Sequence, residues 1–339
     1  MTGASPMRHR LSACAAIALV LAACAEPAGN PAGQPDPAAV LPGDIVSDCG
    51  EVRPDALRDV CVLSHDVMAG RLVGTEGNAL ARTYLIERFA EAGLRPVGED
   101  FVHAFDFQRA VDFRTPDGAR ETFTGYNLIG VVPGADRSQA LAVTAHYDHV
   151  GPGEAGEIYN GADDNASGVG ALLAIAEHFR ENPPRNDVLI IAFDAEEGGL
   201  NGARAFVSDP PEAAAPVALN FNVDMLGYSP DGDVWAAGTY HTPELLPVVD
   251  AAAGVSPLDL KAGYDRPDGD PRNDWTLLSD HGPFHVEGLP FLYLGVEDHE
   301  HYHQPSDEFA IIDPAFYEAA VATAVDLAER LDAWLSEAE

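Results

Sequence analysis

The sequence predicts an α/β fold, a three-layer sandwich whose mixed, mainly parallel central sheet is flanked by helices. Four short apolar runs, most of them rich in β-branched or aromatic residues, are typical of buried strands and lie at 141–145, 188–193, 218–223 and 291–294. An alanine-rich apolar stretch at 169–179 can supply the crossover helix between the first two. With 339 residues, 46% of them hydrophobic, the chain can bury such a core.

Two further helices are predicted to cover the sheet. Residues 78–92 have apolar side chains at helical spacing and are followed by Gly93, a residue that suits the end of a helix. Near the C-terminus, Asp313 can cap a helix that has Pro314 at its first position, and its apolar stripe continues to Leu335.

The first 44 residues are predicted to lie outside the folded domain, 45–339. Residues 1–23 have basic residues before a short apolar stretch, and Leu21-Ala22-Ala23-Cys24 resembles a lipobox, so they are predicted to be a lipoprotein signal peptide. An ordinary secretory signal is the alternative. Residues 24–44 are rich in Pro, Ala and Gly and form a predicted tether. We expect an exported protein held on the bacterial envelope by a lipidated Cys24, at the outer membrane because Ala25 follows, and facing the periplasm or the cell surface.

Charge and cysteine content limit the partners and the compartment. The chain has 55 acidic residues against 19 Lys and Arg, a formal net charge of -36, which disfavours nucleic-acid binding because such a field repels phosphates. Cys49 and Cys61 lie in the predicted domain and are expected to pair in an oxidising compartment. Two free buried thiols are the alternative.

Residue types that bind metals or move protons recur just after the predicted strands. They are His146 and Asp148, then Glu196 and Glu197, then Asp224, and finally the histidines of 299–303, with Asp163 and Asp164 in a loop before the crossover helix. Ligands of open α/β sheets bind beyond the carboxyl ends of the strands. The pattern therefore predicts a metal-assisted hydrolase, in which one of two adjacent glutamates binds metal and the other moves protons.

The order and spacing of these motifs resemble the co-catalytic two-zinc aminopeptidases of family M28. The resemblance spans about residues 66–332 and is carried by His146-Tyr147-Asp148, the Gly161–Gly168 loop, Ala195-Glu196-Glu197-Gly198, Asn222-Val223-Asp224-Met225 and the His303–Asp307 run. It implies a zinc exopeptidase fold and an enzyme that removes N-terminal residues from peptides. A glutaminyl cyclase of the same fold, which uses a single zinc, and a binding protein without catalysis are the alternatives.

The resemblance also implies a ligand set. Asp163 would bridge two zinc ions, His146 and Asp224 would complete the protein ligands of one ion, and Glu197 and His303 those of the other. Co²⁺ or Mn²⁺ could occupy the same nitrogen and oxygen donors. His303 is preferred to its neighbour His301 because it begins the family-like His-Gln-Pro-Ser-Asp run.

Catalytic roles follow from the same resemblance. The nucleophile would be a water or hydroxide between the two ions, and Glu196 would take its proton and deliver it to the leaving amine. Asp148 would orient His146, and a cis peptide would follow the bridging aspartate, at Asp163-Asp164. Asp280 in Ser279-Asp280-His281 could join the proton network or only cap a helix, whereas His149 is expected to be a surface or packing residue.

Overall fold

The structure, a computed structural model, describes residues 42–110, 120–267 and 273–337. The predicted signal peptide, Cys24 and nearly all of the predicted tether lie outside the described residues. The domain boundaries therefore remain a prediction. Across the described ranges, no helix has both the length and the apolar character needed to cross a bilayer.

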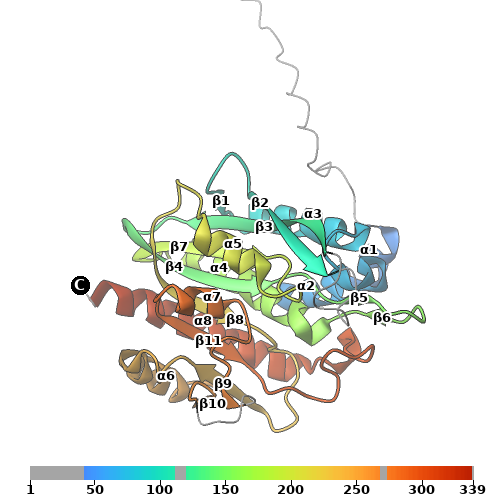
Figure 1. The fold of residues 1–339 in the computed structure, drawn as a ribbon. Coiled ribbons are helices and arrows are strands. Elements are labelled where there is room, and N and C mark those ends of the chain that lie inside the picture. Colours follow the sequence, from blue (N-terminus) through green and yellow to red (C-terminus); the bar gives the residue numbers. More distant parts are fainter. Residues whose placement is uncertain (1–41, 111–119, 268–272, 338–339) are drawn as a thin grey trace, which may run out of the picture. The chain divides into compact units, whose positions relative to one another are not determined.

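A mixed nine-stranded sheet forms the centre of the fold (Figure 1). Its order is β1-β3-β7-β4-β8-β11-β9-β10, and β2 pairs with β3. The strands are β1 (Arg95–Pro96), β2 (Val102–Ala110), β3 (Arg120–Val132), β4 (Asp136–His146), β7 (Asn186–Phe193), β8 (Val217–Val223), β9 (Asp233–Ala237), β10 (Asp259–Ala262) and β11 (Phe291–Gly295). Strands β7, β4, β8 and β11 are parallel to one another and correspond to the four predicted apolar runs. The predicted α/β sandwich is confirmed.

The sheet is buried on both faces because successive side chains of a strand point to opposite sides. In β7, Val188 and Ile190 pack into the larger hydrophobic core with the long helices. Leu189, Ile191 and Phe193 pack into a second core on the other face. Fully burying each such side chain contributes about 1.5–3 kcal/mol, so an all-apolar strand is strongly favoured here.

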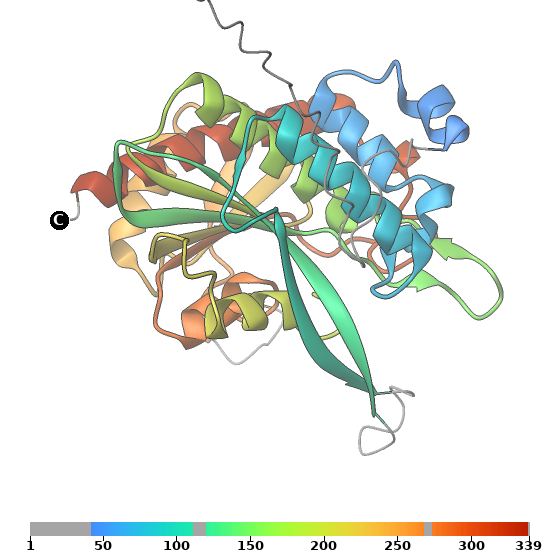
Figure 2. The same ribbon diagram turned by 90° about the horizontal axis from the view of Figure 1, so that it is seen from above.

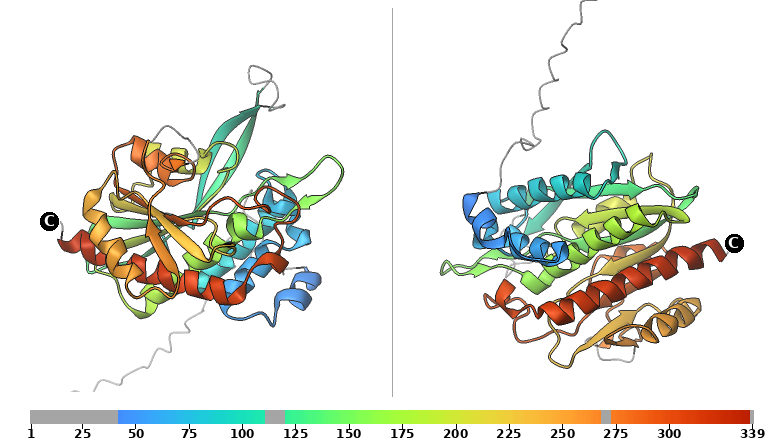
Figure 3. Two further views of the ribbon diagram at one scale, coloured as in Figure 1. Left: turned by 90° about the horizontal axis from the view of Figure 1, so that it is seen from below. Right: turned by 180° about the vertical axis from the view of Figure 1, so that it is seen from behind.

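Helices cover both faces of the sheet (Figures 2 and 3). The larger core contains residues of α1 (Gly43–Cys49), α2 (Asp55–Leu63), α3 (Glu76–Glu91), α4 (Gly168–Glu181), α6 (Leu246–Ala253) and α8 (Pro314–Glu337). The smaller core contains residues of α5 (Asn201–Ser208) and α7 (His281–Val286). Strand β2 and the first half of β3 form a hairpin that extends beyond the rest of the sheet (Figure 2).

The predicted helix ends and the disulfide are confirmed. Asp313 caps α8, because its Oδ1 accepts from the backbone N–H groups of Ala315 at 2.9 Å and Phe316 at 3.2 Å. Gly93 follows α3 with a φ of 75°, in the left-handed region that glycine tolerates best. Cys49 at the end of α1 is joined to Cys61 in α2. This bond suits an oxidising compartment.

Candidate metal centre

Two groups of metal-binding side chain types meet beyond the carboxyl ends of the parallel strands. The first group is His146, Asp164 and Asp224, and the second group is His149, Asp164, Glu197 and His303. Within each group the potential ligand atoms lie within 4.8 Å of one another. Asp164 belongs to both groups, so one carboxylate can face two metal ions.

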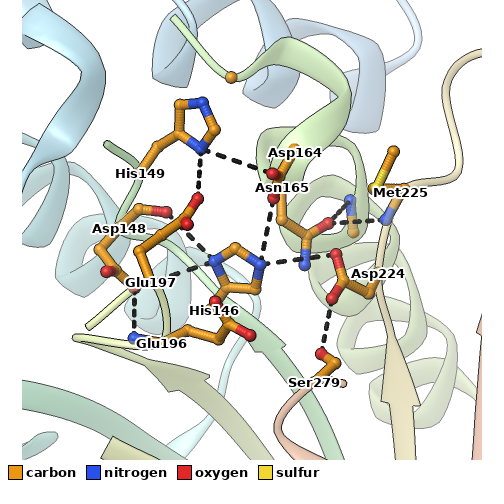
Figure 4. Close-up of polar contacts among 12 residues, drawn as sticks. His146, Asp148, His149, Asp164, Asn165, Glu196, Glu197, Asp224, Met225 and Ser279 are labelled. Atoms are coloured by element: carbon orange, nitrogen blue, oxygen red, sulfur yellow. Dashed lines mark hydrogen bonds and ion pairs between the residues drawn. The ribbon is translucent and has the colours of Figure 1, made fainter. Parts of the chain in front are cut away.

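The first group gathers around the Nε2 atom of His146 (Figure 4). This atom lies 3.3 Å from Asp164 Oδ1 and 3.5 Å from Asp224 Oδ1. On the other side of the ring, Nδ1 lies 3.1 Å from the backbone carbonyl of Asp148. A proton on Nδ1 donated to that carbonyl leaves Nε2 with a free lone pair, which is the form of histidine that binds metals.

Asp224 is held by a polar contact from a neighbouring loop. Ser279 Oγ donates to Asp224 Oδ2 at 2.6 Å and accepts from the amide of Asn222 at 2.9 Å. The other carboxylate oxygen, Oδ1, is buried and has no hydrogen-bond partner among the described residues. It is the atom that faces His146, so the orientation leaves a donor atom directed into the first group.

In the second group, two imidazoles face two carboxylates. His303 Nε2 lies 3.1 Å from Asp164 Oδ2 and 3.2 Å from Glu197 Oε2. His149 Nδ1 lies 2.7 Å from Glu197 Oε1 and 3.7 Å from Asp164 Oδ2. His303 is the most exposed of the four, with a side chain 39% exposed, whereas His149 is fully buried.

Asp163 does not occupy the bridging position that the sequence predicted for it. Its Oδ1 accepts from the backbone N–H of Gly227 at 2.5 Å and from Ser167 Oγ at 2.9 Å, and its Oδ2 lies 2.9 Å from His299 Nε2. It belongs to neither group. The next residue, Asp164, has the shared position, because adjacent side chains of this loop project in different directions.

The cis peptide is displaced by the same one-residue step. It joins Asp164 to Asn165 rather than Asp163 to Asp164. Asn165 then ties this loop to the end of β8, since its Oδ1 accepts from the N–H of Met225 at 3.1 Å. Asp307 fixes the loop from the other side by accepting from the N–H groups of Asp163 at 2.8 Å and Asp164 at 3.1 Å.

Glu196 lies next to the first group, and it lines a cavity that all three residues of that group also line. Its backbone N–H donates to Asp148 Oδ1 at 3.0 Å, whereas that oxygen lies 3.8 Å from His146 Nδ1. Asp148 therefore contacts His146 through its carbonyl and Glu196 through its carboxylate. Burial raises the pKa of Glu196 well above its ordinary value; His146 opposes the shift, and Asp280 adds to it.

The cavity beside the two groups has a volume of about 160 Å³. Acidic and imidazole side chains contribute to its lining, and its apolar and aromatic lining comes from Met225, Trp275, Leu278, Tyr293, Val296 and Tyr302. A cavity with both kinds of lining can hold an apolar side chain of a ligand while a polar group of that ligand lies against the two groups.

The roles of two residues near the site were missed by sequence reasoning. His149 is fully buried within the second group instead of packing elsewhere or facing solvent. Arg71 is also fully buried, and its guanidinium donates to the backbone carbonyls of Leu63, Tyr147, Asn160 and Gly161 at 2.6–2.9 Å. It joins the segments that carry the ligands. A signal for His149 was present, since it is a metal-ligand residue type three positions after His146.

The alternatives in the histidine loop are separated by the structure. His301 Nδ1 lies 2.9 Å from Ser306 Oγ, and His301 is in neither ligand group.

Asp280 is fully buried near the first group, and both its carboxylate oxygens have no hydrogen-bond partner in the described part of the chain. Burial raises its pKa to about 7; His146 opposes that shift and Asp224 adds to it.

Comparison with known proteins gives one family. Residues 127–328 match the model of peptidase family M28. Among curated proteins, Aminopeptidase YwaD of Bacillus subtilis is 29% identical over 207 residues, which cover 54% of this chain and 40% of that protein. Leupeptin-inactivating enzyme 1 of Streptomyces exfoliatus is 32% identical over 180 residues, covering 51% and 37%. The matched regions thus span less than half the length of these relatives.

Solved structures share the fold at low sequence identity. A zinc aminopeptidase from Bacillus subtilis has a TM-score of 0.62 and 17% identity, with 81% of this chain and 94% of that chain covered. A glutaminyl cyclase from Bacteroides thetaiotaomicron has a TM-score of 0.60 and 18% identity, with 80% and 96% covered. The fold is therefore common to two kinds of enzyme, and similarity of fold alone does not distinguish them.

Proposed function

Since this chain belongs to peptidase family M28, we propose that it is a metal-dependent aminopeptidase that hydrolyses N-terminal residues from peptides with two divalent ions, zinc first among them. The observation that carries the proposal is the sharing of Asp164 by two groups of ligand atoms, beside Glu196. The name of the relative Aminopeptidase YwaD supports the same activity.

The residues of both groups fit divalent metal ions. Imidazole nitrogens and carboxylate oxygens are zinc ligands, and Co²⁺ or Mn²⁺ accepts the same donors. Asp224 Oδ1 is buried without a hydrogen-bond partner among the described residues, and His149 Nδ1 and Glu197 Oε1, which lie 2.7 Å apart, make no hydrogen bond of normal geometry. Buried groups of this kind are costly unless they are paired or bind a cation. When bound, two such ions would polarise a peptide carbonyl and lower the pKa of the attacking water.

Glu196 is the proposed general base. Its position beside His146 and Asp224 in the cavity wall lets it accept a proton from the attacking water and deliver that proton to the leaving amine. The hydrogen bond from its backbone N–H to Asp148 holds this residue at the end of β7. Asp148 is proposed to position both Glu196 and His146.

The number of ligand groups favours a peptidase over a cyclase. A cyclase with a single zinc would need only one of the two groups, whereas this chain has two that share Asp164. The apolar lining of the cavity, including Met225 and Tyr302, suits an uncharged first side chain of a peptide.

Metal analysis and a substrate panel test this function together. We expect close to two zinc ions per purified chain and hydrolysis of aminoacyl chromogenic substrates, most rapidly those with apolar first residues. Removal of the metal should abolish the hydrolysis, and added zinc should restore it. A peptide with N-terminal glutamine is the control for cyclisation. Cyclisation without hydrolysis, or full hydrolysis by metal-free protein, would disprove the proposal.

We also propose that the enzyme is exported and anchored to the envelope through a lipid on Cys24. The disulfide between Cys49 and Cys61 supports an oxidising compartment. Cys24→Ser should move the protein from the membrane fraction to the soluble fraction, as measured by immunoblotting after fractionation. Cys14→Ser is the matched control, because Cys14 lies within the predicted signal peptide, and it should leave the protein in the membrane fraction. Retention of the Cys24 variant in membranes would refute the lipid anchor.

A further inference from the structure

We propose that His149 is a fourth protein ligand in the second group, so that this group encloses its metal ion and binds it more tightly than the first group binds the other. The five ligand positions implied by family resemblance do not include His149. The inference rests on the proposed two-metal site.

The position of the His149 ring suits coordination through Nδ1. Figure 4 shows this atom directed at the carboxylates of Glu197 and Asp164, at 2.7 Å and 3.7 Å. His303 Nε2 lies 3.1–3.2 Å from oxygens of the same two carboxylates. Two nitrogen and two oxygen donors thus lie within 4.8 Å of one another, and four is the number of protein ligands in a closed zinc site.

The hydrogen bonding of His149 leaves its ring nitrogens available. The side chain is fully buried, yet neither nitrogen makes a hydrogen bond of normal geometry with any described residue. Buried polar atoms are almost always paired, and the near contacts of Nδ1, to carboxylate oxygens of Glu197 and Asp164, do not have hydrogen-bond geometry, so this imidazole is suited to a further ligand. Glu197 Oε1, the atom nearest to Nδ1, is likewise without a hydrogen-bond partner among the described residues. A cation coordinated by both atoms would satisfy both.

The ring is held in place by close packing against the Asp164 loop. A Cβ atom placed on Gly161 would lie 2.6 Å from the His149 ring, so only glycine leaves room for the imidazole there. Gly161 also has a φ of 57°, which glycine adopts without strain. The loop therefore accommodates His149 against the second group.

The two groups differ in their access to substrate. All three residues of the first group line the cavity beside Glu196, whereas the second group contributes only the shared Asp164 and His303 to its described lining. Three protein ligands with an open side are typical of a catalytic site, and four are typical of a structural site. The first group is thus the open site that receives the substrate, and the second group anchors the shared Asp164.

Zinc titration of metal-free protein tests the assignment. We expect wild type to show two dissociation constants in competition with a chelator of known affinity. His149→Ala and His149→Ser should each raise the smaller of the two dissociation constants by at least about 10–100-fold. A loss of that size already follows when a residue that only orients a metal ligand is removed. His178→Ala, which removes a histidine of α4 outside both groups, should leave both constants within twofold.

X-ray absorption at the zinc edge provides a test that needs no variant. Wild type loaded with one equivalent of zinc should show two imidazole ligands, and a folded His149 variant should show one. Circular dichroism of the metal-free proteins establishes whether each variant is folded. A single imidazole in wild type, or an unchanged tighter constant in a folded variant, would overturn the assignment. Failure of wild type to take up zinc would instead refute the proposed function.

Discussion

Glu196→Gln is expected to lower kcat by about 10²–10⁴-fold, the usual contribution of a general base, while zinc content stays at two ions per chain. Glutamine keeps the size of the side chain but cannot accept the proton of the attacking water. Because Glu196 belongs to neither ligand group, its replacement should not release metal. Steady-state kinetics with an aminoacyl substrate, together with metal analysis of the same preparation, measure both quantities.

Glu300→Gln is the matched control for this prediction. Glu300 lies in the histidine loop near the site, with a side chain 69% exposed, and it belongs to neither ligand group. Its replacement should leave kcat within about twofold, since substitutions of exposed residues that make no buried contact have small effects. A Glu196→Gln enzyme with a wild-type kcat would exclude Glu196 as the base.

Asp164→Asn should remove zinc from both groups, because this carboxylate belongs to both of them. An amide carries no charge and offers one oxygen where two cations need a bridging carboxylate. We expect both dissociation constants to weaken by at least about 10–100-fold and hydrolysis to fall to background. Zinc content after gel filtration and chelator competition check the result.

Asp163→Asn distinguishes the two adjacent aspartates. The Asn oxygen can still accept from the backbone N–H of Gly227, so the loop should persist and both ions should be retained. Loss of zinc from this variant, with retention in Asp164→Asn, would return the bridging role to Asp163. The pair therefore tests a one-residue difference between the sequence prediction and the structure.

The central strands were predictable because they are buried on both faces. All eight residues of β7 are buried, and such a strand has a continuous apolar run. The other strands are less uniformly buried or are shorter. The first residues of β3, Arg120 to Glu121, are exposed, and β9 and β10 are only five and four residues long. Strands that are short, or polar over part of their length, resemble loops in sequence, and β2, β3, β9 and β10 were not predicted.

The types of residue that form the site could be predicted, but not the identity of every residue in it. Positions at strand ends, such as His146 and Asp224, follow from where an apolar run stops. The choice between Asp163 and Asp164 depends on side-chain direction within an irregular loop, for which hydrophobic periodicity carries no information. His149 is a similar case, since its ring packs closely against Gly161, and such a contact between loop residues leaves no periodic pattern in the sequence.

The hydrogen bonds of Asp307 make the metal centre preorganised. Asp307 lies four residues after His303, in the same segment, and it fixes the backbone of Asp163 and Asp164. The conformational entropy of both ligand-bearing loops is thus lost when the chain folds, not when an ion arrives. Binding then needs little further ordering, so more of the interaction energy remains as affinity. One short segment of the chain thereby provides the candidate ligand His303 and also fixes the loop that carries the candidate ligand Asp164.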